Sequence, residues 1–216
     1  MLGCFPLASV LGQTLGTNAA LAGGACLALP GDVAGDGLLA TLTDVTVLAT
    51  YPVLLPILLE QARRASQPPG LRAVVSSGGA PVRADLRAAL HDALGGELLE
   101  TFGPAESAGL ACVTPPGDAG APAVPGVEIG ILDRGRDAEP GRVGELAVRG
   151  PLTTPGYWRD PEATAAAIRN GWCYTGYGAV RDPDGGCHLV DRGWAGGRGR
   201  YGRPGLLRRA WRRVRA

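Results

Sequence analysis

Residues 71–106 read LRAVVSSGGAPVRADLRAALHDALGGELLETFGPAE and contain one complete strand–helix–strand unit. The short apolar runs at 71–76 and 97–101 predict two strands. Between them, leucines recur every fourth residue through 83–94, which predicts an amphipathic helix. Both strands end in turn-forming residues, SSGGAP and TFGPAE. We therefore expect two loops to meet at the edge of a parallel sheet, where α/β proteins bind their ligands.

The same alternation extends toward the N-terminus. Residues 25–29 and 45–48 predict two further strands, and residues 54–64 predict a helix. Strands that alternate with helices are typical of an α/β layer with a mainly parallel sheet. We therefore expect an α/β subdomain over residues 1–114.

After the Thr-Pro-Pro-Gly turn at 114–117 the pattern changes. Short strands are expected at 127–132, 145–149 and 188–191, with glycine, proline and aspartate between them. This spacing predicts a small antiparallel β subdomain over residues 115–192.

The composition is that of a globular chain with an unusual choice of basic residue. Of the 216 residues, 45% are hydrophobic, and the 35 Gly and 18 Pro lack the three-residue period of a collagen. All 21 basic residues are arginine. The chain therefore excludes any mechanism that needs a lysine of its own, such as Schiff-base formation or a phosphate-loop lysine.

The charge is divided unevenly along the chain. Residues 1–192 carry 13 Arg against 20 acidic residues, a net charge of −7, whereas residues 193–216 carry 8 Arg and no acid, a net charge of +8. We expect residues 193–216 to stand outside the folded domain. A segment rich in Arg, Gly and Trp without acids is typical of a high-GC gene translated out of frame, and this is our interpretation. The alternative is that its basic end binds an anionic membrane surface, or RNA without sequence specificity. This alternative is the weaker one, because basic runs match binding patches easily by chance.

Cysteine usage and the uncharged N-terminal residues both bear on the compartment. Five cysteines occur without the C-x-x-C spacing of a zinc or redox site, so we expect free thiols in a reducing cytoplasm. Residues 1–31 carry no charge, but they lack the basic start of a signal peptide. Polar residues also interrupt them too often for a membrane span, and we expect them to join the core.

The two strand-end loops are the candidate sites. Gly78-Gly79-Ala80-Pro81 follows a strand and precedes a helix, so its backbone can approach a planar or anionic ligand closely. The alternative is a plain strand-to-helix turn, which this motif alone favours. Glu106 lies just past the second strand and offers the type of carboxylate that holds Mg²⁺. Equally, Glu106 can begin a helix and complement its dipole.

Residues 144–164 are dense in turn formers and aromatic side chains. They predict a strand, a tight turn that packs Tyr157 and Trp158, and a helix that begins at Pro161. Nothing in this segment is obviously catalytic, so its interpretation is structural.

Taken together, these segments resemble the AMP-forming adenylating enzymes, the acyl-CoA synthetases and their relatives. The resemblance runs from about Phe5 to Arg192, and it implies that the fold is part of the large domain of such an enzyme. Val190-Asp191-Arg192 is more similar to fatty-acid and other acyl-CoA ligases than to peptide-synthetase adenylation domains. The motifs stand in the family's order: Ser77-Gly78-Gly79-Ala80-Pro81, Thr101 to Glu106, Gly144-Glu145-Leu146, Gly156-Tyr157-Trp158 with Pro161 to Thr164, Gly171-Trp172 with Thr175-Gly176, and Val190-Asp191-Arg192.

The resemblance implies a reaction and a site. A small-molecule carboxylate, fatty or otherwise hydrophobic, attacks the α-phosphate of ATP and pyrophosphate leaves. The thiolate of CoA then displaces AMP from the acyl-adenylate. Glu106 is the implied catalytic carboxylate that holds Mg²⁺, while Tyr51, Pro52 and Gly78 are implied to wall the acyl pocket. The implied nucleotide-binding residues are Gly79, Ala80, Pro81, Glu100, Thr101, Phe102, Gly103, Pro104, Ala105, Tyr177 and Arg192.

The sequence departs from the family pattern at several points. Tyr177 stands where the family has an aspartate that accepts hydrogen bonds from both ribose hydroxyls, which a phenol cannot do. Ala105 replaces a hydroxyl residue, and Ser9 replaces a histidine found in many members. The family's phosphate loop is expected N-terminal to Phe5, outside this chain. Directly after Arg192 the resemblance stops, before the family's Lys-Asp-x-Ile and its lysine-bearing small domain.

These departures predict that the chain alone completes neither half-reaction, because no lysine is present to fill the family's catalytic role. Two other interpretations stay open. The chain is then either a non-catalytic module that keeps a nucleotide or acyl-CoA cleft, or one subunit of a split enzyme.

Overall fold

The structure is a computed structural model that describes residues 1–31, 37–64, 69–78, 82–114, 121–182 and 186–192. The chain divides into two compact units, Met1–Asp118 and Ala119–Ala216. Each unit is built on one β-sheet. The boundary predicted near residue 115 and the segment 193–216 both lie outside the described residues.

The first unit contains a five-stranded sheet in the order β1-β2-β3-β4-β5. The first four strands are parallel, and β5 runs antiparallel to β4. The predicted α/β layer with a mainly parallel sheet is confirmed. The strands are β1 Leu2–Gly3, β2 Val47–Thr50, β3 Ala73–Ser77, β4 Glu97–Phe102 and β5 Cys112–Thr114.

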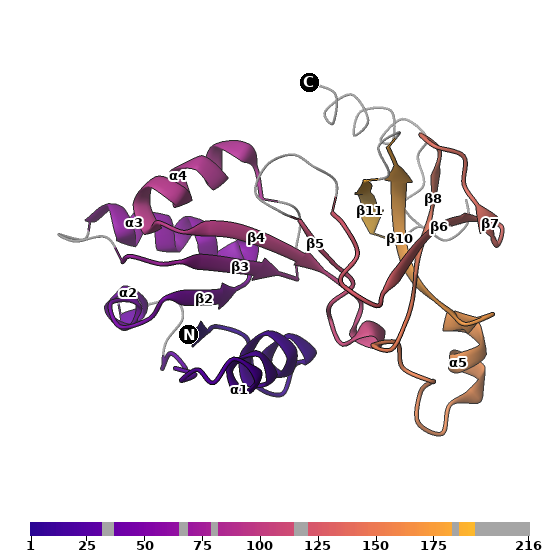
Figure 1. The fold of residues 1–216 in the computed structure, drawn as a ribbon, viewed down its shortest axis with the longest axis horizontal. Helices are drawn as coiled ribbons and strands as arrows, with labels where there is room; N and C mark the ends of the chain where they lie inside the picture. Colours follow the sequence, from indigo (N-terminus) through magenta and orange to yellow (C-terminus); the bar gives the residue numbers. More distant parts are fainter. Residues whose placement is uncertain (32–36, 65–68, 79–81, 115–120, 183–185, 193–216) are drawn as a thin grey trace. The chain divides into compact units, whose positions relative to one another are not determined.

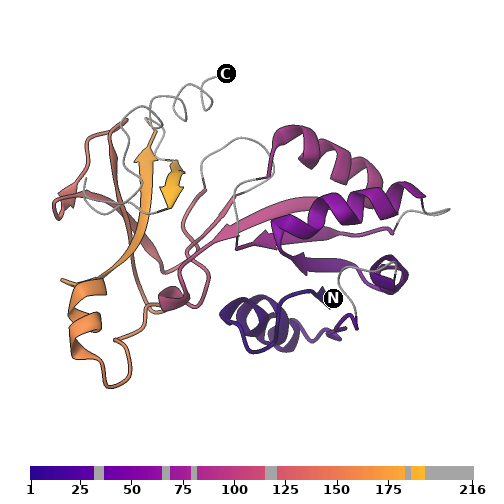
Figure 2. The same cartoon turned by 180° about the vertical axis from the view of Figure 1, so that it is seen from behind.

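Helices cover both faces of this sheet. Figures 1 and 2 show α3 (Leu55–Arg64) and α4 (Ala84–Leu94) on one side of β2, β3 and β4, and α1 (Ala19–Ala22) on the other. A π-helix, η1 (Gly12–Asn18), leads directly into α1. The buried leucines of a short helix, α2 (Gly37–Leu42), join the same apolar cluster as those of α3 and α4.

The strand registers explain this two-sided packing. Leu48, Val74 and Leu98 are neighbours across β2, β3 and β4, and all three belong to the cluster that contains the α3 and α4 leucines. The next residues along, Ala49 and Val75, pack instead with the N-terminal apolar residues. Because side chains alternate along a strand, a sheet with helices on both faces needs apolar residues at consecutive positions.

The strand predicted at residues 25–29 is not formed. Only Ala28 makes an isolated parallel bridge, to Leu2, and its N–H donates to Met1 O at 2.8 Å. The ladder ends there because β1, its neighbour, is only two residues long. The edge strand of the parallel sheet is therefore β1.

The second unit contains an antiparallel sheet in the order β11-β10-β8-β6-β7, with β9 paired to β10. Strand β10 was not among the predicted elements, because glycines interrupt its run of aromatic and β-branched residues. The strands are β6 Glu128–Asp133, β7 Arg136–Asp137, β8 Val143–Arg149, β9 Ile168–Arg169, β10 Trp172–Arg181 and β11 Cys187–Arg192.

The helix predicted from Pro161 is present as α5 (Pro161–Ala167). The Asp160 side chain caps it by accepting a hydrogen bond from the Ala163 N–H at 2.9 Å. The expected packing of Trp158 in the preceding turn is wrong, since this side chain is 86% exposed. The Arg159 guanidinium stacks over its ring, 5.5 Å from the centroid, and so both side chains stay at the surface.

All five cysteines are free thiols, as predicted, and four of them are buried. Within the described residues, no helix is long and apolar enough to cross a membrane.

Candidate functional site

The carboxyl ends of three parallel strands lie together at one edge of the first sheet. Thr50 of β2 pairs in register with Ser76 of β3, and Ser77 pairs with Thr101 of β4. The hydroxyl of Ser77 also donates to Thr101 O at 3.2 Å. The segments that follow these strand ends are therefore brought to the same edge, which is where open α/β sheets bind ligands.

Two of the three residues predicted to wall an acyl pocket are in close proximity. Gly78 has φ +82°, and a Cβ there would lie 3.0 Å from Leu11 Cδ1 and 3.0 Å from Tyr51 Cε1. The Tyr51 ring in turn packs edge-on against Phe5, with ring centroids 4.6 Å apart. Pro52 follows Tyr51 and begins a 3₁₀ turn, η2 (Pro52–Leu54).

Leu11 and Phe5 were missed as members of this cluster. They precede Tyr51 by some forty residues, and nothing in a local pattern joins the two segments. A Cβ on Gly109 would also lie 2.9 Å from Leu11 Cδ2, so the same leucine contacts the loop after β4.

The loop after β4 carries Glu106 and is tightly folded. A Cβ on Gly103 would lie 2.3 Å from Leu110 N, so only glycine allows this backbone crossing. Glu106 is half-buried within a one-turn 3₁₀ helix, η3 (Ala105–Ser107). Ala108 then adopts the left-handed conformation at φ 56°, and its carbonyl accepts a hydrogen bond from Thr14 Oγ1 at 2.7 Å. The loop is thus braced by η1.

The described residues contain no group of three His, Cys, Asp or Glu side chains arranged to hold a metal. Mg²⁺, however, takes only one or two protein carboxylates when phosphate oxygens and water complete its shell. A single half-buried carboxylate at Glu106 fits an ion that arrives with a nucleotide. Its place in the first turn of η3 equally fits the structural alternative, although a helix of one turn has only a small dipole.

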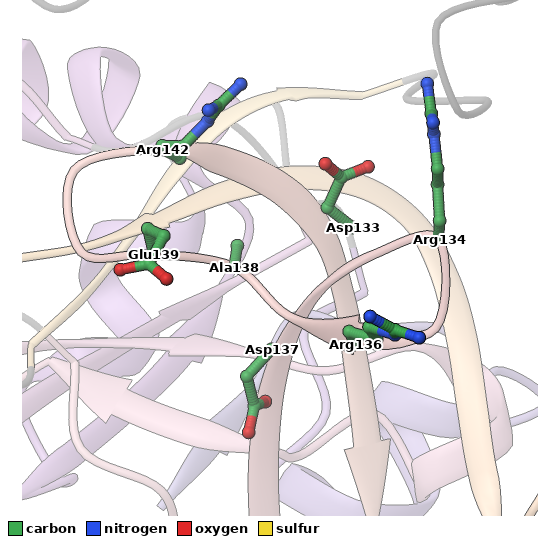
Figure 3. A pocket seen from close by; sticks show the side chains of 7 residues that line it. All are labelled: Asp133, Arg134, Arg136, Asp137, Ala138, Glu139 and Arg142. Atoms are coloured by element: carbon green, nitrogen blue, oxygen red, sulfur yellow. The ribbon is translucent and has the colours of Figure 1, made fainter.

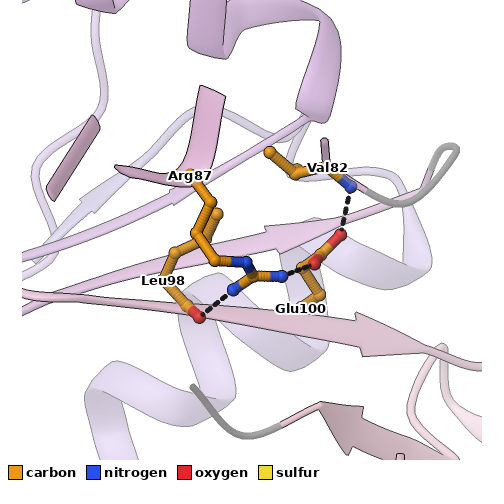
Figure 4. A network of polar contacts seen from close by, with 4 residues as sticks. All are labelled: Val82, Arg87, Leu98 and Glu100. Atoms are coloured by element: carbon orange, nitrogen blue, oxygen red, sulfur yellow. Dashed lines mark hydrogen bonds and ion pairs between the residues drawn. The ribbon is translucent and has the colours of Figure 1, made fainter. Parts of the chain in front are cut away.

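Glu100 lies near the carboxyl end of β4, and its carboxylate is turned toward α4. Glu100 Oε1 accepts a hydrogen bond from Val82 N at 2.6 Å, and Oε2 pairs with Arg87 of α4 (Figure 4). Of the other predicted nucleotide-binding residues in this unit, Thr101 to Pro104 are half-buried and Ala105 is exposed. Gly79, Ala80 and Pro81 lie outside the described residues.

In the second unit, the two predicted nucleotide-binding residues are neighbours. Tyr177 of β10 pairs in register with Arg192 of β11, whose side chain is not among those described. The register of β10 against β8 shifts between Tyr174 and Gly178. Within this bulge Gly176 has φ +71°, as a glycine readily does.

Glu145, from the Gly144-Glu145-Leu146 motif, supports the bulge. Its Oε1 accepts a hydrogen bond from Gly176 N at 3.2 Å, and Thr175 Oγ1 donates to Leu146 O at 2.7 Å. Burial raises the pKa of the Glu145 carboxyl, while the Gly176 hydrogen bond and the Arg169 charge act in the opposite direction.

A depression of about 510 Å³ lies on the β6–β7 hairpin, and none of its lining residues is among those predicted to be functional. Arg134 and Arg142 extend away from Asp137 and Glu139, so no group of like charge converges on one point (Figure 3). Its charged lining is balanced, three arginines against three acids, which gives it no preference for an ionic ligand. The lining residues are Asp133, Arg134, Arg136, Asp137, Ala138, Glu139 and Arg142.

Comparison with known proteins identifies the family. Residues 1–158 match the family described as AMP-binding enzyme. The chain is 35% identical over 156 residues to a 2-succinylbenzoate–CoA ligase of Geobacillus kaustophilus, and 40% identical over 124 residues to a long-chain-fatty-acid–CoA ligase of Escherichia coli. The chain therefore belongs to the AMP-binding enzyme family.

A solved structure supports the same fold. The O-succinylbenzoate coenzyme A synthetase from Bacillus subtilis, in complex with AMP, superimposes with a TM-score of 0.77 over 88% of this chain at 24% sequence identity. The match covers 40% of that structure's chain. The alignments to the two ligases cover 69% and 54% of this chain but only 31% and 22% of the relatives' length.

Proposed function

We propose that this chain supplies the carboxylate-binding and adenylate-binding parts of an AMP-forming acid–CoA ligase that acts on a fatty or other hydrophobic carboxylate. The observation that carries this proposal is the shared edge of β2, β3 and β4. There Tyr51, Gly78 and the loop from Gly103 to Glu106 follow three neighbouring strand ends. Membership of the AMP-binding enzyme family, together with the similarity to two CoA ligases, supports ATP, a carboxylic acid and CoA as the substrates.

The acyl group is proposed to lie against Tyr51, Pro52 and Gly78. Their surroundings favour a hydrophobic substrate, because Leu11 and Phe5 pack with Tyr51 in one apolar cluster. Burying an apolar acyl chain on such a surface contributes about 25 cal/mol per Å² of apolar area.

The nucleotide is proposed to be bound by the remaining predicted residues. In the first unit these are the residues around the β3 and β4 ends, and Glu106 holds Mg²⁺ together with the phosphates. When bound, Mg²⁺ neutralises phosphate charge. In the second unit, Tyr177 and Arg192 bind the ribose and the adjacent part of the nucleotide. The full set is Gly79, Ala80, Pro81, Glu100, Thr101, Phe102, Gly103, Pro104, Ala105, Tyr177 and Arg192.

We propose that the chain alone binds these ligands without turnover. It contains no lysine, so the cationic role that the family gives to a lysine is unfilled. Tyr177 is also a poorer ribose acceptor than the family's aspartate.

The proposal is tested first by binding. Titration with AMP and with a non-hydrolysable acyl-sulfamoyl adenosine should give saturable binding, and Mg²⁺ should strengthen the binding of ATP. In Glu106→Ala the Mg²⁺ effect should disappear. The matched control is Glu97→Ala. Glu97 is an exposed carboxylate at the start of β4, whereas Glu106 lies in the loop that follows the other end of this strand. Failure of the wild-type chain to bind either adenosine ligand would overturn the proposed function.

Turnover is tested separately by ATP–pyrophosphate exchange with a panel of carboxylic acids. We expect no acid-dependent exchange above the Glu106→Ala background. Exchange well above that background would show that the chain is catalytic without a lysine, contrary to the proposal.

A further inference from the structure

We propose that Glu100 is a positioning residue for the adenylate site, acting through Val82 and held in place by Arg87. This inference rests on the proposed function, since it gives one of the proposed nucleotide-binding residues an indirect role. Glu100 would fix the backbone on the α4 side of the β3–α4 connection instead of contacting the base.

Both carboxylate oxygens of Glu100 are engaged within the protein. Oε1 accepts the hydrogen bond from Val82 N at 2.6 Å, and Oε2 is paired with Arg87 Nη2. The second nitrogen of the same guanidinium, Nη1, donates to Leu98 O at 2.9 Å. Figure 4 shows the carboxylate between Val82 on one side and the Arg87 guanidinium on the other.

The pairing geometry also identifies which face of the sheet Glu100 serves. Leu98, two residues earlier on β4, is buried in the cluster that contains the α4 leucines. Because strand side chains alternate, Glu100 points to the same face as Leu98, toward α4. Thr101, whose backbone pairs with Ser77, points to the other face.

Burial makes the pair costly to break. The side chains of Glu100 and Arg87 are 15% and 21% exposed. A carboxylate that is so little exposed to solvent needs a charged partner and donated hydrogen bonds. The planar guanidinium of Arg87 supplies the charge, and it can donate to the carboxylate and to the Leu98 carbonyl at the same time.

The carboxylate also stands at the N-terminus of an eleven-residue helix. Arg83, at the N-cap of α4, makes no side-chain capping hydrogen bond. A negative charge bonded to Val82 N, directly before the N-cap, complements the positive end of the helix dipole. The position of Val82, and with it the start of α4, is therefore set from β4.

The test separates the contact from its effect on binding. Glu100→Gln keeps an oxygen acceptor for Val82 N, whereas Glu100→Ala removes it. The matched control is Arg83→Gln, which breaks a surface ion pair with Asp85 whose side chains are 82% and 66% exposed. For each variant we would measure amide hydrogen exchange at Val82 by NMR and the dissociation constant for AMP, after far-UV circular dichroism has verified the fold.

We expect Glu100→Ala to speed Val82 exchange and to weaken AMP binding, each by about tenfold, as loss of a hydrogen bond to a charged group would do. Glu100→Gln should recover most of both losses, and Arg83→Gln should change neither. Unchanged Val82 exchange in Glu100→Ala would overturn the contact. Faster exchange with unchanged AMP affinity would overturn the positioning role.

Two further outcomes also count against the proposal. In one of them, Glu100→Gln and Glu100→Ala lose the same AMP affinity, but the Val82 amide stays protected from exchange in Glu100→Gln. The Glu100 charge would then act on the nucleotide directly. If the wild-type chain binds no AMP, the proposed function fails and the positioning role fails with it, even where the exchange data show the Val82 hydrogen bond.

Discussion

Substituting Gly103 by alanine should destabilise the first unit more than any exposed glycine substitution. The added Cβ would lie 2.3 Å from Leu110 N, 2.6 Å from Gly109 C and 2.7 Å from Ala111 N. All three atoms belong to the backbone, so no side-chain rotation relieves the overlap. The backbone at Gly103 must therefore move away from the backbone of residues 109–111, where β4 turns toward β5. The 2.7 Å hydrogen bond from Ala111 N to Phe102 O joins these two backbone segments.

The size of the effect follows from these contacts. Overpacking of a core costs about 1–3 kcal/mol when side chains absorb it. Here the backbone must move and a hydrogen bond worth about 1 kcal/mol is strained, so we expect a loss of about 3 kcal/mol in the free energy of unfolding. This corresponds to a little over a hundredfold in the folding equilibrium constant.

The assay is urea denaturation followed by far-UV circular dichroism, which detects α3 and α4. Tryptophan fluorescence is unsuitable for this unit, because all four tryptophans lie beyond residue 118. Gly70→Ala is the matched control, since a Cβ there meets nothing within 4 Å. If Gly103→Ala and Gly70→Ala had the same urea midpoint, the close crossing inferred for Gly103 would be wrong.

Three further predictions concern thiols, acidity and the ribose site. Burial raises the pKa of Cys4 and Cys187 to about 11, so at pH 8 iodoacetamide should modify the exposed Cys26 first, and mass spectrometry should find the other two unmodified until the protein unfolds. Burial raises the pKa of the Glu145 carboxyl, so the folded state loses stability as the pH rises above the ordinary value of about 4.5. The melting midpoint of Glu145→Gln should therefore rise relative to that of wild type as the pH is increased from 4 to 7. A constant difference between the two midpoints at every pH would contradict this. Tyr177→Asp should tighten AMP binding by about tenfold by restoring a charged acceptor, which equilibrium titration measures. Unchanged or weaker binding would argue against a ribose contact at this position.

The parallel part of the fold was accessible from the sequence. Strands β2, β3 and β4 are short apolar runs beside helices with a clear leucine period, and in such segments local pattern and tertiary burial agree. The differences there are shifts of one or two residues at strand ends, as with the strand predicted at 45–48 and found at Val47–Thr50.

The failures occur where tertiary pairing decides the local structure. Residues 25–29 have the composition of a strand, but their only available neighbour is two residues long. Strand β10 carries glycines inside its run because it bulges between Tyr174 and Gly178, and a bulge is a property of two strands together. A single-strand pattern cannot reveal either case.

The candidate site shows the same division. The strand-end loops were predicted because their glycines and prolines punctuate the sequence locally. The contacts that hold them were not, since Leu11 reaches Gly78 across more than sixty residues and Arg87 meets Glu100 from a separate element. The residue type alone does not predict either contact, because arginine and leucine are both common on helices that make no such contact.

The hydrogen bond from Thr14 to the carbonyl of Ala108 has a consequence for the order of folding. It joins residues 94 positions apart, whereas Ser77 Oγ and Thr101 O are separated by only 24. Loop-closure entropy grows as about 1.5 RT ln n, so the longer closure costs about 1.2 kcal/mol more. That difference slows the longer closure by about eightfold, other things being equal. The contact between the ends of β3 and β4 should consequently form early in folding. The Thr14–Ala108 hydrogen bond, which holds the Glu106 loop, should form late, after the sheet has assembled and η1 has packed against it.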